Sequence, residues 1–290
     1  MLRNKTAVGG RRSAVKEAKQ SETRITNGYD RLLKILKKMG SALVAFSGGV
    51  DSALVARAVA EALKEKAVAV TAISATLSER ERLFAKEVAK LIGIRHIEIE
   101  IDELSSAEFV ANSPHRCYYC KRLRMARLQR YAVEAGFNFV VDGANIDDLE
   151  DWRPGLKANE ELGVRSPLIE ASIGKLEVRT LLDELGLPFW NRPSSPCLAS
   201  RLPYGTTVTR EKLAQIEAAE EAVRALGVAD VRVRHHGDTA RIEVPGSDFQ
   251  KILAADQLSR CFKKIGFKYI ALDLDGLRSG SLNETIKPSK

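Results

Sequence analysis

The sequence has little of what membrane-spanning and disulfide-built proteins need. Its 290 residues include only 4 cysteines and 6% aromatic residues. No apolar run approaches the roughly 18 residues that cross a bilayer, and the first residues lack the apolar core of a secretory leader. Two cysteines form a Cys-x-x-Cys pair, which in a reducing compartment more often binds metal or does redox chemistry than forms a structural disulfide. We therefore expect a cytoplasmic protein without a membrane partner.

Positive charge is unevenly distributed along the chain. The formal net charge is +8, and residues 1–22 carry six basic against two acidic side chains, half of the excess. This segment has no apolar periodicity, so we expect a disordered basic tail. The charge that remains suits a small anionic nucleotide substrate as well as RNA.

From residue 41 onward, short apolar runs alternate with amphipathic stretches. This pattern predicts an α/β fold with a doubly wound parallel sheet, whose ligands bind beyond the carboxyl ends of the strands. The expected strands are 42–46, 67–73, 96–101 and 139–142, and the expected helices between them are 52–63 and 78–92. Proline-rich residues 188–203 mark a boundary, after which Thr209 can cap a helix. Strand-like runs at 228–233, 240–244 and 269–274, with a helix near 258–265 that carries Cys261 as a core residue, then predict a smaller α+β unit. The predicted domains are 1–22 (tail), 23–203 (α/β) and 204–290 (α+β).

The most specific motif is Ser-Gly-Gly-Val-Asp-Ser at residues 47–52, which follows a buried strand and opens a helix. Gly48 and Gly49 allow successive N–H groups to point at an anion, and the helix start adds positive potential. The motif lacks the lysine of a Walker loop and contains Asp51 instead, so it is not a GxxxxGK[ST] loop.

This string resembles the signature of the PP-loop ATP pyrophosphatases, which split ATP between its α- and β-phosphates. The resemblance implies activation of a carboxylate or carbonyl as an adenylate, with Asp51 placing Mg²⁺ or the pyrophosphate. The ATP contacts that it implies are Ala45, Phe46, Ser47, Gly48, Gly49, Asp51, Ser52 and Gly143.

Acidic residues follow the fourth expected strand, at the same edge of the sheet. Asp142, Asp147, Asp148 and Asp151 lie within ten residues, together with Asn145. Clustered carboxylates there can hold Mg²⁺, which prefers oxygen ligands, and a solvated turn explains them equally well.

Three cysteines lie in unusual surroundings. Cys117 and Cys120 share one side of a helical turn, and Cys197 stands in Ser-Pro-Cys-Leu-Ala-Ser-Arg at 195–201. Neighbouring Arg116, Lys121, Arg122 and Arg201 favour the thiolate form, which binds metal or attacks an electrophile. Zinc held by these cysteines with His115 is one reading, and buried thiols are another.

Taken together, the segments SGGVDS, RCYYCK, DGAN, SPCLASR and LDLDGLRSGSLN resemble the LarE family of sulfur transferases over roughly residues 25–285. The resemblance implies that the enzyme adenylates the carboxylates of a pyridinium biscarboxylic acid mononucleotide. It then converts them to thiocarboxylates in nickel-pincer nucleotide biosynthesis, as a homo-oligomer built through the C-terminal domain. In the single-cysteine form of the family, the residue matching Cys197 gives up its own sulfur and becomes dehydroalanine.

The additional Cys117 and Cys120 resemble the three-cysteine members, which hold a [4Fe–4S] cluster. The resemblance therefore implies three metal-binding and catalytic cysteines, at 117, 120 and 197, with Asp51 as a further catalytic residue. The sequence leaves open whether Cys197 is sacrificed or only ligates a cluster.

Basic residues near the cysteines are candidates for binding the anionic substrate. Arg232 and Arg234 alternate with valines on an expected strand, and Arg201 follows Cys197. Two or three charged guanidinium groups match phosphate and carboxylates, although an ordinary charged strand face gives the same pattern. Asp273, Asp275 and Arg278 match the family's terminal motif without an assigned role.

Two other functions use the same loop. A PP-loop tRNA thiolase pairs it with three cluster-binding cysteines, but the chain has no cysteine-rich zinc finger and concentrates its charge in the tail, so we expect no nucleic-acid partner. A PP-loop amidotransferase uses ammonia instead of sulfide, and the cysteines argue against it.

Overall fold

The computed structural model describes residues 27–149 and 154–278. The predicted basic tail, Asp151 and residues 279–283 of the terminal motif lie outside this range. The chain divides into two compact units, each assembled from three stretches. Unit 1 takes its described residues from 27–72, 83–99 and 124–194, and unit 2 from 73–82, 100–123 and 195–278. The predicted domain boundary at residues 203 and 204 stays a prediction, because a compact unit need not fold independently.

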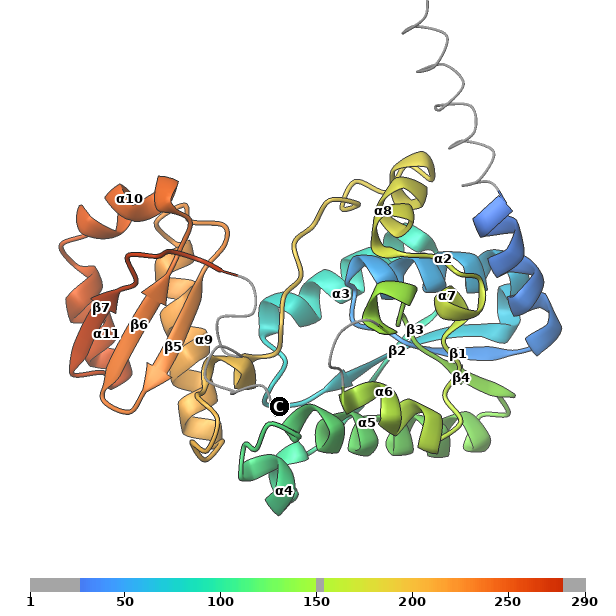
Figure 1. Ribbon diagram of the computed structural model, residues 1–290, viewed down its shortest axis with the longest axis horizontal. Helices are drawn as coiled ribbons and strands as arrows, with labels where there is room; N and C mark the ends of the chain where they lie inside the picture. The colour runs from blue at the N-terminus through green and yellow to red at the C-terminus, as the bar shows by residue number, and fades with distance from the viewer. Residues whose placement is uncertain (1–26, 150–153, 279–290) are drawn as a thin grey trace, which may run out of the picture. The chain divides into compact units, whose positions relative to one another are not determined.

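Unit 1 is built on a parallel sheet with strand order β3-β2-β1-β4 (Figure 1). The strands are β1 (Ala42–Ala45), β2 (Ala67–Ile73), β3 (His96–Glu100) and β4 (Phe139–Val141). Each lies within one residue of its expected range. Residues buried on both faces make β1, β2 and β4 short apolar runs, whereas the edge strand β3 alternates isoleucine with glutamate. The predicted α/β fold with a parallel sheet is confirmed.

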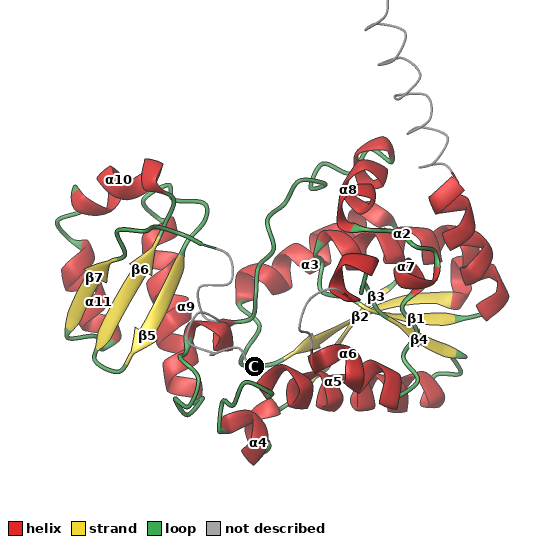
Figure 2. Ribbon diagram, in the orientation of Figure 1, coloured by secondary structure: helices red, strands yellow, loops and turns green. Residues whose placement is uncertain are grey.

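Helices cover both faces of this sheet (Figure 2). They are α2 (Val50–Leu63), α3 (Glu79–Ile92), α5 (Arg116–Glu134), α6 (Pro154–Glu161), α7 (Pro167–Glu170) and α8 (Lys175–Glu184), with a further helix over 27–39 and short turns η1 (Lys64–Lys66) and η3 (Ile146–Leu149). Both α2 and α3 begin and end within two residues of their expected ranges. Among the described residues, no helix combines the length and apolarity that a membrane span requires.

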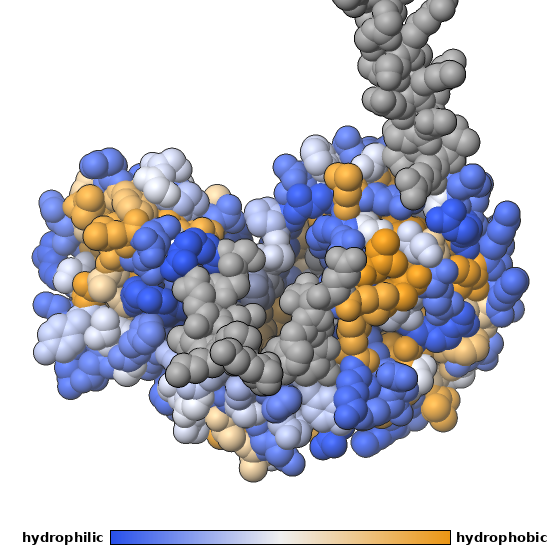
Figure 3. Space-filling view, viewed as in Figure 1, coloured by the Kyte–Doolittle hydropathy of each residue, from blue (hydrophilic) through white to orange (hydrophobic). Residues whose placement is uncertain are grey.

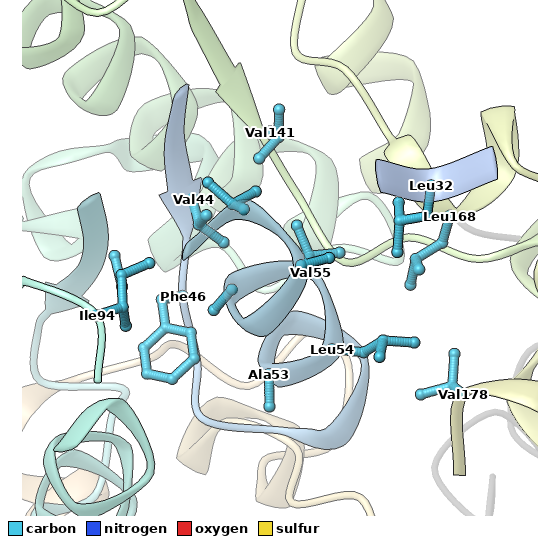
Figure 4. Packing of buried hydrophobic residues seen from close by; sticks show 14 of the residues in the cluster. Leu32, Val44, Phe46, Ala53, Leu54, Val55, Ile94, Val141, Leu168 and Val178 are labelled. Carbon is cyan, nitrogen blue, oxygen red and sulfur yellow. The ribbon is translucent and has the colours of Figure 1, made fainter. Parts of the chain in front are cut away.

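The alternation along β1 divides its side chains between two cores. Ala42 and Val44 belong to the cluster packed by α2, α7, α8 and the helix at 27–39, whereas Leu43 belongs to the cluster that includes Met125 and Leu128 of α5. Figure 4 shows the first cluster, in which Val44 and Phe46 face residues from α2. This double burial holds the carboxyl end of β1, where the nucleotide loop begins.

Unit 2 contains a three-stranded sheet of order β5-β6-β7. Its strands are β5 (Arg232–His236), β6 (Thr239–Glu243) and β7 (Tyr269–Leu272), with β5 antiparallel and β7 parallel to β6. It also contains the first residues of α5, up to Leu123. Its further elements are η2 (Glu103–Ser105), α4 (Ala107–Val110), η4 (Leu198–Arg201), α9 (Arg210–Arg224), η5 (Gly246–Asp248), α10 (Phe249–Leu253) and α11 (Leu258–Ile265). The predicted α+β architecture is confirmed.

Local details of unit 2 follow the sequence with two exceptions. Thr209 caps α9 as expected, since its side chain accepts a hydrogen bond from the Lys212 amide at 3.3 Å. The strand expected at 228–233 begins only at Arg232, because Val228 and Val231 are buried in the core without strand pairing. Cys261, expected in the core, is only half-buried on α11. Hydrophilic residues prevail on the surface drawn in Figure 3, with apolar residues in smaller patches between them.

Candidate functional site

The nucleotide loop of unit 1 is closed by the two serines of its motif. The Ser47 amide donates to Ser52 Oγ at 3.3 Å, and Ser52 Oγ donates to the Gly49 carbonyl at 3.0 Å. The two hydroxyl oxygens lie 3.1 Å apart, and the Gly49 amide donates to Ser47 Oγ at 3.3 Å. Gly49 is the N-cap of α2 and provides no side-chain cap, so the first turn of the helix directs its N–H groups outward as an anion site requires.

Two glycines allow the chain to pass where no side chain fits. Gly48 has φ +75°, and a Cβ there would lie 2.8 Å from Ala85 Cα. Gly143, two residues after the end of β4, would place a Cβ 2.7 Å from the Ser52 amide nitrogen. The segment after β4 therefore packs directly on the first turn of α2, which explains why both glycines occur here.

Asp51 lies in the first turn of α2 and has two polar partners. Asn145 Nδ2 donates to Asp51 Oδ1 at 3.3 Å, and the Lys175 ammonium forms an ion pair with Asp51 Oδ2. The Lys175 amide, at the start of α8, donates to Asp147 Oδ2 at 2.7 Å. Sequence analysis missed Lys175, although a Gly-Lys pair that opens a helix was a visible indication. The structure brings a lysine to the loop that lacks the Walker lysine.

The acidic residues after β4 are largely engaged in local hydrogen bonds. Asp142 is buried and accepts from Asn159 Nδ2 at 2.6 Å and from Ser166 Oγ at 2.8 Å. Asp148 Oδ2 accepts from the Asn145 amide at 3.1 Å. These contacts favour the turn interpretation over magnesium binding at Asp142 and Asp148.

His96 supports the entry to the loop from inside the sheet. Thr71 Oγ1 donates to the Phe46 carbonyl at 2.9 Å and lies 2.8 Å from His96 Nε2, while the Phe46 and His96 rings meet edge to face at 5.7 Å. Burial lowers the pKa of His96, so its ring is held neutral. The His96 ring therefore supports the main chain that leads into the loop.

The three candidate cysteines all belong to unit 2. Cys117 and Cys120 lie in the first two turns of α5, and Cys197 is the N-cap of η4. Cys120 and Cys197 pack against the same buried apolar cluster, which includes Phe109 and Leu198. Burial is the main reason that the pKa of Tyr204 is raised. Cys117 and Cys197 both lie near enough to its phenol to raise the pKa further by electrostatic interaction. The structure thus brings the two cysteine segments together within one unit.

A buried carboxylate connects the two cysteine segments. Glu103 Oε1 accepts from Cys120 Sγ at 3.7 Å and from Thr76 Oγ1 at 3.4 Å. The Thr76 carbonyl in turn accepts from the amide of Leu198, next to Cys197, at 2.9 Å. Sequence analysis did not identify Glu103. Within the described ranges, no three His, Cys, Asp or Glu side chains lie as the ligands of a single metal ion do.

Three buried arginines hold the main chain around Cys197. Arg201 NH1 donates to the Pro196 carbonyl at 2.7 Å and to the Cys197 carbonyl at 3.3 Å. Arg116 donates to the carbonyl of Ala199 and Arg234 to the carbonyl of Ser200, each at 2.8 Å. The backbone conformation of the Cys197 segment is therefore fixed by protein groups alone.

These contacts change the interpretation of two predicted substrate-binding residues. Arg201 is paired with Glu220, and Arg234 with Glu243, in ion pairs whose side chains are all 5% exposed or less. Their guanidinium groups are engaged by protein acceptors, so the structure gives both a positioning role, and substrate contact stays a prediction. Arg232 is more open, although NH1 donates to the Arg278 carbonyl at 2.9 Å, and burial lowers its pKa.

The terminal residues without an assigned role form local contacts beside β7. Asp273 accepts from the Asp275 amide at 3.0 Å and pairs with Arg241 at 3.5 Å. Arg278 pairs with Asp275 at 3.4 Å. Asp273 and Asp275 therefore shape the turn that follows the last strand.

A parallel α/β sheet with this loop at the carboxyl end of β1 defines a nucleotide-binding protein of the PP-loop class, and the NAD synthase family model matches residues 25–146. The pyridinium-3,5-bisthiocarboxylic acid mononucleotide synthase of Lactiplantibacillus plantarum is 41% identical over 257 residues, 88% of this chain and 93% of that protein. An uncharacterized protein of Synechocystis sp. is 43% identical over 260 residues, 89% of this chain and 97% of the relative. The chain belongs to the family of this synthase, the LarE family.

A relative of another activity matches less of the chain. The tRNA-cytidine(32) 2-sulfurtransferase of Ralstonia nicotianae is 27% identical over 136 residues, which is 44% of each protein.

Proposed function

We propose that the protein is an ATP-dependent sulfur transferase that makes the thiocarboxylates of a pyridinium bisthiocarboxylic acid mononucleotide. The observation that carries the proposal is the identity of 41% across 93% of a synthase with that product, in a chain that keeps the complete loop. A substrate carboxylate oxygen attacks the α-phosphorus of ATP, and pyrophosphate leaves. A sulfur nucleophile then attacks the carbonyl carbon of the acyl-adenylate, and AMP leaves.

In the first step, the loop binds the phosphates of ATP. The main chain of 45–49, the first turn of α2 and the close approach of Gly143 form the ATP site that the sequence predicts. Asp51 would hold Mg²⁺, because its carboxylate is partly exposed at the helix start. With Asp51 bound to Mg²⁺, the Lys175 ammonium would contact the pyrophosphate and stabilise the negative charge that develops on it as it leaves.

In the second step, the cysteines of unit 2 supply sulfur chemistry. Cys117, Cys120 and Cys197 match a thiolate-ligated iron–sulfur cluster in number and donor type, and the contacts that join their segments support this assignment. Such a cluster, when bound by three thiolates, offers an iron with an open position where sulfide can bind. Cys117, Cys120 and Cys197 would hold the cluster through their thiolates.

The chain's own residues position this chemistry. Arg116, Arg201 and Arg234 hold the Cys197 backbone, and the start of α5 adds positive potential near Cys117 and Cys120. Arg232, the least enclosed of the predicted arginines, is our candidate for contact with the anionic substrate. We further propose that the protein acts as a cytoplasmic homo-oligomer.

The alternative activities have less support. The tRNA sulfurtransferase relative matches only 44% of the chain, and the NAD synthase model stops at residue 146, before Cys197. Pyrophosphate release that depends on tRNA would favour a tRNA thiolase. Full product formation from ammonia by Cys197→Ala would favour an amidotransferase.

The proposed adenylation is tested by replacing the loop carboxylate. Asp51→Asn should abolish pyrophosphate release that depends on the pyridinium biscarboxylic acid mononucleotide, while iron bound after anaerobic reconstitution stays near the parent value. Asp183→Asn, which removes an exposed carboxylate from α8 of the same unit, should change neither quantity. Unchanged pyrophosphate release in Asp51→Asn would contradict the role of the loop.

A further inference from the structure

One side chain connects the two cysteine segments directly. Arg116 immediately precedes Cys117 in α5 and is 2% exposed. Its NH1 donates at 2.6 Å to Asn112 Oδ1, four residues earlier in the chain, and at 2.8 Å to the carbonyl of Ala199, two residues after Cys197. The guanidinium carbon also lies 5.7 Å from the ring centre of Tyr204. The Arg116 guanidinium is thus fixed between the segment before Cys117 and the segment after Cys197.

Asn112 completes the connection from the other side. Its Nδ2 donates to the Pro203 carbonyl at 2.8 Å and to the Thr206 carbonyl at 2.9 Å, and its own carbonyl accepts from the Gly205 amide at 3.0 Å. Its backbone has φ +53°, in the left-handed region that asparagine tolerates better than most residues. Asn112 is fully buried, so these hydrogen bonds are not exchanged with solvent.

We propose that Arg116, oriented by Asn112, is the positioning residue that sets the separation of Cys197 from the Cys117–Cys120 pair before any cluster or substrate binds. The purpose of this arrangement rests on the proposed function, because only a shared sulfur or iron site needs the thiols at a fixed separation. The Glu103–Thr76 link and the apolar cluster also join the segments. Arg116 differs from them because it is a charged side chain of the cysteine-bearing helix that hydrogen-bonds directly to the main chain of the Cys197 segment.

Short-range crosslinking of the thiols in iron-free protein tests this proposal. The background is Cys261→Ser, which leaves Cys117, Cys120 and Cys197 as the thiols, and the probe is dibromobimane, which bridges two nearby sulfurs. Peptide mass mapping separates the bridge between Cys117 and Cys120 from bridges to Cys197. Both partners of the first bridge lie on α5, so their separation does not depend on the contact of Arg116 with Ala199, and the yield of this bridge serves as an internal reference.

We expect Arg116→Met to lower the ratio of Cys197 bridges to the reference bridge roughly tenfold, since the two segments lose their fixed effective concentration. Arg116→Lys should restore part of the ratio, because an ammonium keeps a donor with a shorter reach. Arg130→Gln, which removes an exposed guanidinium farther along the same helix, should leave the ratio unchanged.

Asn112→Gly provides a second route if Arg116→Met does not fold. Glycine adopts the backbone φ of +53° without strain, so this variant loses the side-chain contacts and keeps the turn. We expect it to lower the ratio as Arg116→Met does.

A ratio within about twofold of the background in a folded Arg116→Met or Asn112→Gly variant would overturn the proposal, as would the absence of Cys197 bridges in the background. The assay uses neither ATP nor iron. If Arg116→Met lowers the ratio as expected but the parent protein transfers no sulfur, the proposed function is refuted and the positioning role stands. If the parent protein transfers sulfur but Arg116→Met leaves the ratio unchanged, the positioning role is refuted and the proposed function stands.

Discussion

Replacing Glu220 by glutamine removes the negative charge that neutralises Arg201, which holds the main chain of the Cys197 segment. Glu220 is 2% exposed on α9. Its Oε1 accepts from Arg201 Nε at 2.7 Å and from the Val233 amide at 3.1 Å, and its Oε2 accepts from Arg201 NH2 at 3.2 Å and Arg224 NH2 at 3.0 Å. Glutamine can keep the first two bonds through its carbonyl oxygen. Its amide group then faces two guanidinium nitrogens, donor against donor.

The expected cost follows from this geometry. Removing one partner of a buried ion pair leaves an uncompensated charge and costs about 3–5 kcal/mol. Arg201 is 4% exposed in its side chain, so water relieves little of that cost. With an m-value of roughly 2–3 kcal/mol/M in urea, the transition midpoint should fall by about 1–2.5 M. Arg201 also holds the Pro196 and Cys197 carbonyls, so the Cys197 segment should loosen with it.

The assay is equilibrium urea unfolding followed by far-ultraviolet circular dichroism, with Glu221→Gln as the matched control. Glu221 is the next residue of the same helix, is 50% exposed, and pairs with Arg224 at 2.7 Å. An exposed pair contributes about 0–1 kcal/mol, so this control should unfold almost as the parent does. If Glu220→Gln costs no more than Glu221→Gln, the reasoning about the buried arginine network is wrong.

Two further predictions concern the loop lysine and a buried histidine. Lys175→Met should lower the rate of pyrophosphate release by roughly 10²–10³-fold, because a positive charge at the departing pyrophosphate is lost. Lys157→Met, which removes an exposed ion pair with Glu161, should leave this rate unchanged. An equal effect of the two substitutions would contradict the role of Lys175 at the pyrophosphate. His235 is buried, and burial lowers its pKa below the ordinary value near 6.5, with Lys212 and His236 adding to the effect. The unfolded chain therefore takes up a proton there before the folded chain does, and the free energy of unfolding should fall as pH drops below about 6.5, by up to about 1.4 kcal/mol per pH unit for this group. Urea unfolding at several pH values should show a shallower fall in His235→Gln, and an unchanged slope would show that His235 is not held neutral.

The sheet and the loop could be predicted from sequence because their determinants are local. The strands β1, β2 and β4 of unit 1 are short apolar runs, and β3 alternates apolar with charged residues. Gly48 and Gly49 mark the tight turn of a phosphate-binding loop. The same is true of the Thr209 cap, where one side chain binds an amide three residues away. Such features need no knowledge of distant parts of the chain.

The missed features all depend on partners far apart in the sequence. Lys175 reaches Asp51 across 124 positions, and Arg116 reaches Ala199 across 83. Arg201 and Arg234 look like ligand-binding residues in sequence, because nothing local shows that Glu220 and Glu243 will be buried beside them. The second compact unit includes 73–82 and 100–123 for the same reason: their partners, such as Leu198 for Thr76, come from the last third of the chain.

We propose that this chain transfers sulfur repeatedly from a site built on three cysteines, so that Cys197 is not consumed. The most direct test of this proposal is a reaction of reconstituted protein with ATP, sulfide and the pyridinium biscarboxylic acid mononucleotide, in which thiocarboxylate product and intact protein mass are measured in the same sample. The account predicts several thiocarboxylates per polypeptide and an unchanged protein mass. A product yield that stops at one sulfur per chain, together with a mass loss of about 34 Da from conversion of Cys197 to dehydroalanine, would contradict it.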